Sequence, residues 1–337
     1  MIVAWRHGDA PLHHAVSGTD ETGRVLTADA LMPIASITKL ATALAILRLV
    51  DTGEVDLDAA IGRWIPDAVA GTRDLTARHC LTHIGGLPAD VDGARAPYGP
   101  GLDWPMLAAA CAATPPIQAA GVSVIYSNVG IGVLATIVER VHGTSFLAAA
   151  RTLVFTPLGI GGTLGREPPQ PPVRVAGVVP PLEPGEEPSP RESISYRFWR
   201  GVGFPWGGMV ATAEDALRLV AAFAGRPSGF LSDRTRAEAT RDQTLGLGGG
   251  MPVFQLTWPA CAWGLGAEFQ GGKVRHWAPR EAGPDSFGHV GATGTIAWHA
   301  PQFDTTWAMF APRFFLPWIT DIGPRVGAAV LRDAARG

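Results

Sequence analysis

The chain has 337 residues, of which 47% are hydrophobic and 17% are charged, and its formal net charge at pH 7 is −3. These values fit one large domain, or two sub-domains that share a core, and they exclude a disordered chain. Because the sequence contains no block rich in lysine and arginine, we expect no nucleic acid partner.

Cysteine content and apolar stretches bear on the compartment. Cys80, Cys111 and Cys261 form no C-x-x-C pair, and so few cysteines do not build a disulfide framework. The first residues are too interrupted for a signal peptide, and the most apolar stretch, residues 40–50, falls well short of the ~20 residues of a membrane span. We therefore expect a cytoplasmic protein without a membrane partner, although a chain trimmed of its leader would look the same.

The first half of the chain changes from strand to helix patterns. Two short strands are predicted at residues 2–7 and 11–17, joined by a tight turn. A helix is predicted over residues 36–50, where apolar side chains recur at helical spacing. Residues 60 to about 165 are predicted to be mostly helical, most clearly the segment 129–142, which a glycine follows.

The second half begins with residues 166–191, whose many prolines predict an extended surface loop, either a tolerated insertion or a lid over a site. Thr212 and Asp215 are spaced as a capping pair at the start of a helix. Short apolar runs from 261 to 310 predict a meander of antiparallel strands, and residues 323–336 predict a closing helix.

Strands at both ends with helices between them predict an α/β (α+β) fold, in which an antiparallel sheet is flanked by helices. We expect the sheet sub-domain to comprise residues 1–60 and 205–337. An inserted all-helical sub-domain is expected at residues 61–204, and it contains the proline-rich loop 166–191.

Ser36 and Lys39 are the first pair of residues that point to chemistry. Their spacing places both side chains on one helix face, one turn apart. A serine hydroxyl needs a base to become a nucleophile, and desolvation can lower the pKa of a lysine enough for that role. The alternative is a helix-capping serine beside a solvated lysine.

Tyr126 and Asn128 precede the helix predicted at residues 129–142. A phenol can relay protons, and an amide can orient a substrate carbonyl or amide group. The alternative is that Ser127 or Asn128 caps the helix and that Tyr126 contributes only packing.

A third group lies between two predicted strands. Gly291 lies two residues after His289, and a glycine in a strand lets a ligand approach the backbone closely. The N–H of Ala292 can then face a developing oxyanion, with the N–H of Ser36 as second donor. The alternative is a bent strand with a surface histidine.

Taken together and in this order, these motifs resemble those of the serine β-lactamase and penicillin-recognising enzyme superfamily. The resemblance is to the class C β-lactamase-like branch, which includes family VIII esterases, D-alanyl-D-alanine carboxypeptidases and D-aminopeptidases. It extends over about residues 3–312 and is carried by the segments 34–39, 81–88, 126–130, 207–212 and 287–291.

The resemblance implies a β-lactamase-like fold with the site between its two parts. It implies that Ser36 is the acylated nucleophile, that Lys39 is its partner, that Tyr126 is the phenolic acid/base and that Asn128 contacts the substrate amide. His289 and Gly291 occupy the family's third motif, which is commonly Lys-Thr-Gly. Val290 departs from that motif because it lacks the hydroxyl that helps hold a substrate carboxylate.

Other chemistries find no support in the sequence. No G-x-S-x-G motif occurs, which excludes an α/β-hydrolase elbow at the motif level. His79 and His83 have the spacing of a zinc protease motif, but Cys80 stands where that motif needs glutamate. We expect no metal and no cofactor.

The sequence therefore predicts a serine hydrolase that forms an acyl-enzyme on Ser36. Because His289 is mostly neutral near its reference pKa and Val290 cannot hydrogen-bond, we expect a preference for small uncharged esters. Alternatives are a D-alanyl carboxypeptidase, a D-aminopeptidase or a weak β-lactamase, and a penicillin-binding or sensor-type protein without turnover. The partner is then a small ester or amide; the sequence fixes neither the oligomeric state nor whether Lys39 or Tyr126 is the acylation base.

Overall fold

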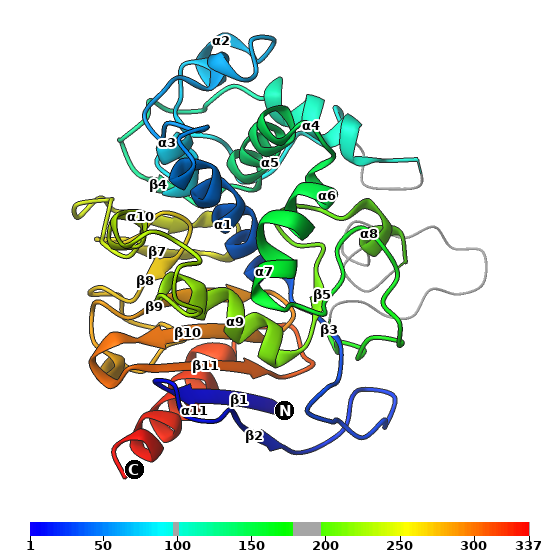
Figure 1. Cartoon of the computed structure of the whole chain (residues 1–337), viewed down its shortest axis with the longest axis vertical. Coiled ribbons are helices and arrows are strands. Elements are labelled where there is room, and N and C mark those ends of the chain that lie inside the picture. The colour runs from blue at the N-terminus through cyan, green and yellow to red at the C-terminus, as the bar shows by residue number, and fades with distance from the viewer. Residues whose placement is uncertain (97–100, 178–196, 337) are drawn as a thin grey trace.

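The computed structural model describes residues 1–96, 101–177 and 197–336. A six-stranded antiparallel sheet in the order β2-β1-β11-β10-β9-β8 joins the two ends of the chain (Figure 1). Its strands are β1 (Ile2–His7), β2 (His13–Val16), β8 (Glu268–Phe269), β9 (Phe287–Gly291), β10 (Thr295–Ala300) and β11 (Thr305–Phe310). The predicted N-terminal hairpin and the meander near the C-terminus are both confirmed.

Helices cover both faces of this sheet. All residues of β10 and β11 are buried, because α9 (Ala213–Phe223) packs on one face and α11 (Ile319–Ala334) on the other. Strands buried on both sides read as continuous apolar runs rather than as an alternation. This explains why β10 and β11 have the sequences TIAWHA and TTWAMF.

The closing helix begins earlier than its predicted start at residue 323. Helix α11 starts at Ile319, and Gly323 lies inside it. A Cβ atom on Gly323 would stand 2.6 Å from the carbonyl oxygen of Trp277. This glycine therefore allows a close approach of helix and loop and does not mark a helix boundary.

The remaining helices gather above the sheet in Figure 1. Helix α5 ends at Gly143 with a φ of 74°, as the sequence predicts. None of the helices in the described part of the chain is long and apolar enough to cross a membrane. The helices other than α9 and α11 are α1 (Thr38–Asp51), α2 (Ala70–Arg73), α3 (Ala77–Leu81), α4 (Trp104–Ala112), α5 (Asn128–His142), α6 (Phe146–Ala150), α7 (Thr156–Leu158), α8 (Arg197–Val202) and α10 (Asp233–Ala239), with a π-helical turn at Arg151–Phe155.

Two small sheets connect the helices to the main sheet. Strand β3 (Met32–Pro33) pairs with β5 (Val210–Ala211), and β4 (Val124–Ile125) pairs with β6 (Gly249–Met251), which in turn pairs with β7 (Leu256–Trp258). The short β4 was not predicted, because two residues give no periodicity. These strands lead into the segments that carry Ser36 and Tyr126. The division into sub-domains at residues 60 and 205 stays a prediction.

The described part of the proline-rich segment, residues 166–177, is extended and anchored at two points. The side chains of Val173 and Val175 are buried, and the N–H of Val173 donates to the carbonyl oxygen of Leu31. Ala176 forms a parallel β-bridge with Arg313. The rest of the predicted loop, residues 178–191, lies outside the described residues, and the choice between insertion and lid stays open.

Candidate active site

Ser36 and Lys39 meet at the entrance to α1. Ser36 lies in a 3₁₀ turn (Ala35–Ile37) that precedes the helix, and the Nζ atom of Lys39 lies 3.2 Å from its Oγ atom. The carbonyl oxygen of Trp206 accepts a second hydrogen bond from Nζ at 3.1 Å. The side chain of Lys39 is 1% exposed, and the alternative of a solvated lysine is therefore wrong.

The turn that contains Ser36 begins with a strained backbone, which neighbouring side chains hold in place. Ala35 has a φ of 45°, in the left-handed region that alanine rarely adopts. The hydroxyl of Thr293 donates to the carbonyl oxygen of Pro33 at 2.6 Å, and that of Thr295 donates to the carbonyl oxygen of Ile34 at 3.2 Å. The sequence analysis assigned no role to either threonine, because their hydrogen-bond partners are more than 250 residues away in the chain.

Gly291 explains how the end of β9 reaches this turn. A Cβ atom at Gly291 would stand 2.2 Å from the carbonyl oxygen of Ile34, and hence only glycine allows the two segments to touch. Ala292 follows directly, beside the segment that carries Ser36. The role of the Ala292 N–H as an oxyanion donor stays a prediction.

Burial changes the protonation of Lys39. It lowers the pKa of the ammonium well below the ordinary value, and the carboxylate of Asp90 opposes this effect only in part. The neutral amine, which the low-dielectric surroundings favour, has a lone pair that can accept a proton. The Ser36 hydroxyl lies 3.2 Å from Nζ, within reach for the transfer of such a proton.

Tyr126 lies on the other side of the same cluster. Its backbone N–H donates to the carbonyl oxygen of Gly250 at 2.9 Å, which continues the β4–β6 pairing up to the site. The Nζ atom of Lys39 lies 4.6 Å from the centre of the phenol ring. Burial raises the pKa of Tyr126 above its ordinary value, while a hydrogen bond with Ser36 opposes the rise. The phenol therefore stays protonated at neutral pH and is a proton donor.

His289 is fully buried, and the alternative of a surface histidine is wrong. Its Nδ1 atom lies 2.7 Å from the carbonyl oxygen of Val290, which can only accept, and Nδ1 therefore carries the proton. The Nε2 atom faces the hydroxyl of Tyr126 at 3.5 Å. Burial and the nearby Lys39 lower the pKa of His289 to about 4, and the ring is neutral at pH 7.

His83 belongs to the same cluster, although the sequence analysis gave it no role beyond its place in segment 81–88 and in the zinc-like spacing. Its Nδ1 atom accepts a hydrogen bond from the N–H of Ser127 at 3.2 Å, and its ring centre lies 4.8 Å from that of Tyr126. Ser127 caps α5 by accepting from the N–H of Gly130. The capping alternative is thus correct for Ser127, while Tyr126 beside it still reaches the site.

Asn128 opens onto a pocket next to Tyr126. Its Nδ2 atom donates to the carboxylate of Asp90 at 3.2 Å, and its Oδ1 atom is buried without a partner among the described residues. The pocket has a volume of about 180 Å³. Asp90 is the one charged residue among those that line it, which are Ala89, Asp90, Tyr126, Asn128, Met251, Pro252 and Phe254. No motif or periodicity had marked Asp90.

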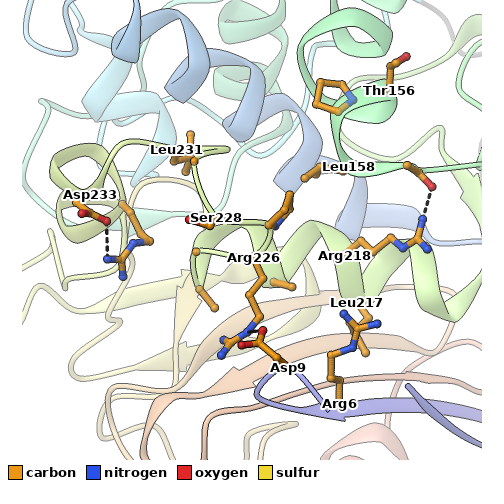
Figure 2. A pocket seen from close by; sticks show the side chains of 18 residues that line it. Arg6, Asp9, Thr156, Leu158, Leu217, Arg218, Arg226, Ser228, Leu231 and Asp233 are labelled. Carbon is orange, nitrogen blue, oxygen red and sulfur yellow. Dashed lines mark hydrogen bonds and ion pairs between the residues drawn. The ribbon is translucent and has the colours of Figure 1, made fainter. Parts of the chain in front are cut away.

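A larger pocket of about 900 Å³ lies away from this cluster, between α7, α9 and the loop that follows α9 (Figure 2). Its walls contain four arginines, and three of them are tied to carboxylates: Arg218 to Glu214, Arg226 to Asp304 and Arg236 to Asp233. None of the residues predicted to do chemistry lines it. The smaller pocket beside Tyr126 is therefore the candidate substrate site.

Metal ligands are not grouped anywhere in the described ranges: no three His, Cys, Asp or Glu side chains are placed to hold an ion. His79, the other half of the zinc-like spacing, instead caps α3. Its Nδ1 atom accepts a hydrogen bond from the N–H of Thr76 at 3.2 Å.

Comparison with known proteins gives a family match over nearly the whole chain. The sequence model of the Beta-lactamase family matches residues 1–330. The chain belongs to this family. Esterase EstB of Burkholderia gladioli is 35% identical over 279 residues, which cover 72% of this chain and 69% of that protein. Penicillin-binding protein 4 of Amycolatopsis lactamdurans is 29% identical over 301 residues, which cover 85% and 73%.

Solved structures show the same fold. A beta-lactamase from Mycobacterium bovis has a TM-score of 0.67 at 25% identity and covers 99% of this chain and 94% of its own. The D-amino acid amidase from Ochrobactrum anthropi SV3 has a TM-score of 0.71 at 20% identity, with 99% and 92% covered. The predicted β-lactamase-like fold is confirmed, and the chain is a member of a family of serine hydrolases.

Proposed function

We propose that the chain is a hydrolase that forms an acyl-enzyme on Ser36 and prefers small uncharged esters. The observation that supports this best is the 3.2 Å contact between Lys39 Nζ and Ser36 Oγ, in surroundings that favour the neutral amine. A base at hydrogen-bond distance is what a serine hydroxyl needs to act as a nucleophile.

The reaction divides into two steps with the same proton carriers. In the first, Lys39 takes the proton of the Ser36 hydroxyl while Oγ attacks the ester carbonyl carbon, and the N–H groups of Ser36 and Ala292 face the developing oxyanion. Tyr126 protonates the leaving alcohol as its bond to the carbonyl carbon breaks, and it recovers a proton from Lys39. In the second step, water attacks the acyl carbon and gives its proton to the same groups; the bond between that carbon and Ser36 Oγ breaks, Oγ takes up a proton, and the carboxylic acid leaves.

Charge and size in the pocket support the preference for uncharged esters. His289 is neutral, and its two ring nitrogens face the carbonyl oxygen of Val290 and the hydroxyl of Tyr126. The pocket of about 180 Å³ has the carboxylate of Asp90 in its wall, which repels a substrate carboxylate. The relative from Burkholderia gladioli is named an esterase, which agrees with this preference.

The test is covalent labelling followed by turnover. A fluorophosphonate probe should label the peptide that contains Ser36, and the label should disappear in Ser36→Ala but persist in the matched variant Ser127→Ala. Labelling of Ser36→Ala would refute the nucleophile. Steady-state hydrolysis of p-nitrophenyl acetate supports an enzyme, whereas a single burst followed by no release supports a penicillin-binding protein without turnover.

A further inference from the structure

The indole of Trp263 lies against three rings of the candidate active site. It is 1% exposed. Its ring centre is 4.6 Å from that of His83 in an edge-on contact, 5.7 Å from that of His289 and 5.8 Å from that of Tyr126. Contacts of this kind fix the relative positions of the rings. Trp263 lines neither of the two pockets described above.

A buried ion pair lies against Trp263 as well. The Nζ atom of Lys273 is 5.7 Å from the centre of the Trp263 ring and 2.8 Å from the carboxylate of Glu268, and both charged side chains are fully buried. Lys273 also donates to the carbonyl oxygens of Ala262, at 3.0 Å, and Phe269, at 2.7 Å. Its three donors are thus all engaged, and one of them holds the backbone next to Trp263.

An ion pair at this depth calls for an explanation other than stability. Removing two charges from water costs several kcal/mol per ion, and a well-packed apolar pair is often at least as stabilising. The hydrogen bonds between Lys273, Glu268 and the backbone do, however, hold the lysine side chain in one orientation. Since the ammonium has three partners, it cannot shift away from the indole without breaking a buried hydrogen bond.

We propose that Trp263 is a positioning residue for the hydrolytic reaction, held by Lys273 and Glu268 so that its indole keeps the phenol of Tyr126 at Ser36. The inference rests on the proposed function, because Tyr126 has to transfer a proton for its position to matter. A smaller side chain at position 263 would leave the Tyr126 ring free to tilt away from Ser36.

The expected effect is a loss of kcat with little change in KM. A displacement of about 1 Å at a reacting group can cost on the order of 100-fold in rate. We therefore expect Trp263→Leu to lower kcat for ethyl acetate, whose alcohol needs a proton in order to leave, by roughly 10- to 100-fold and to change KM by less than about threefold, since Trp263 does not line the candidate substrate pocket. Trp263→Phe, which keeps an aromatic ring, should recover part of the loss and also serves if Trp263→Leu does not fold.

Trp258 provides the matched control. Lys273 lies 5.3 Å from the Trp258 ring, and Trp258 is buried in the same apolar cluster, but its ring contacts are to His276 and Trp277 and not to the candidate site. Trp258→Leu should therefore destabilise the fold as Trp263→Leu does and leave kcat within about threefold of the unaltered chain. Equal losses of kcat in both variants would refute a positioning role for Trp263.

A double-mutant cycle tests whether Trp263 acts through Tyr126. Trp263→Leu should lower kcat much less in the Tyr126→Phe background than in the unaltered chain, because the group that it positions is then absent. Multiplicative losses would overturn the proposal. Failure of the proposed function has a different signature, namely hydrolysis that persists in Ser36→Ala, and the two failures can be told apart.

Discussion

The Nζ atom of Lys39 lies 3.2 Å from the Oγ atom of Ser36, and both groups stand at the entrance to α1. Burial disfavours the charged ammonium form of Lys39, which cannot act as a base, and favours the neutral amine, which can. Burial thus favours the neutral amine of Lys39 and the protonated phenol of Tyr126, which supports the proposed roles of base for Lys39 and acid for Tyr126. The sequence alone leaves open which of the two residues is the base during acylation.

Replacing Lys39 by methionine should abolish catalysis without unfolding the chain. Methionine has a similar length but cannot accept a proton, and kcat should fall by roughly 10²- to 10⁴-fold, as is typical of the loss of a positioned proton acceptor. Stability should hold or rise, because a buried amine that has no carboxylate partner within hydrogen-bond distance among the described residues is replaced by an apolar group. Thermal unfolding and ester turnover measure the two effects separately.

Lys273→Met is the contrasting variant. Lys273 pairs with Glu268 at 2.8 Å, and its removal leaves the buried carboxylate with the ring of His276, at 3.5 Å, in place of an ammonium. Breaking such a pair costs about 3–5 kcal/mol. A Lys39→Met variant that unfolds as readily as Lys273→Met, or one that retains turnover, would contradict the assignment of Lys39 as a base.

The effect of Tyr126→Phe should depend on the leaving group. If the protonated phenol donates to the departing alcohol, an ethyl ester with its poor leaving group loses most, by roughly 10²- to 10⁴-fold in kcat. For a p-nitrophenyl ester, whose phenolate leaves without being protonated, kcat should fall far less. Acylation rates for the two esters of the same acid measure this. Equal losses for both would remove Tyr126 as the general acid.

Much of the fold was predictable because its patterns are long or bounded by residues with fixed roles. Helix α5 ends at Gly143 as predicted, and the capping pair of Thr212 and Asp215 is present at the start of α9. The cluster around Ser36 follows from short motifs that carry several groups each. The start of α11 was mispredicted because Gly323, which resembles a helix boundary, serves a close contact with Trp277.

The residues that the sequence did not reveal act through distant partners. Trp263 contacts Tyr126 and His289, but nothing in the sequence around position 263 differs from an ordinary buried strand. Asp90 reaches Asn128 across 38 positions of the chain. Pairings of this kind depend on the tertiary fold, and neither local propensity nor periodicity encodes them.

Stability should decrease as the pH falls from 6.5 towards 4. Burial lowers the pKa of His289 to about 4 from 6.5, and below pH 6.5 the unfolded chain takes up a proton that the folded chain does not. The contribution is complete above pH 6.5 and is lost progressively as the pH falls to about 4. A difference of this size corresponds to about 3 kcal/mol.

Urea unfolding at a series of pH values measures this loss. His289→Gln should make the free energy of unfolding less dependent on pH in that window. His14→Gln, on the exposed strand β2, is the control and should leave the dependence unchanged. An identical pH dependence in His289→Gln and the unaltered chain would show that His289 does not titrate as described.

Asp90→Asn should move the acid limb of the pH profile. Burial is the main cause of the low pKa of Lys39, and the Asp90 carboxylate partly opposes it by favouring the ammonium. Without that carboxylate the pKa of Lys39 falls further, and the acid limb of kcat/KM for a neutral ester should shift to lower pH by roughly half a unit to one unit. Asp92→Asn, an exposed acid in the same loop, should leave the limb in place. A shift to higher pH would contradict the sign of this coupling.

The proposed preference for uncharged esters rests on the charges around the pocket. Cephalosporins and peptides that end in D-Ala-D-Ala carry a carboxylate near the scissile amide, whereas the pocket beside Tyr126 has Asp90 in its wall and no lysine or arginine among the described residues that line it. The nearby His289 is neutral and Val290 has no hydroxyl. An unpaired anion at such a site costs about 1–3 kcal/mol, or roughly one to two decades in kcat/KM.

Short-chain p-nitrophenyl esters should therefore have a higher kcat/KM than cephalosporins and D-Ala-D-Ala peptides. Asp90→Asn should narrow this gap by raising kcat/KM for the anionic substrates. A cephalosporin or a D-Ala-D-Ala peptide with a higher kcat/KM than each ester tested would refute the preference and leave the Ser36 mechanism intact.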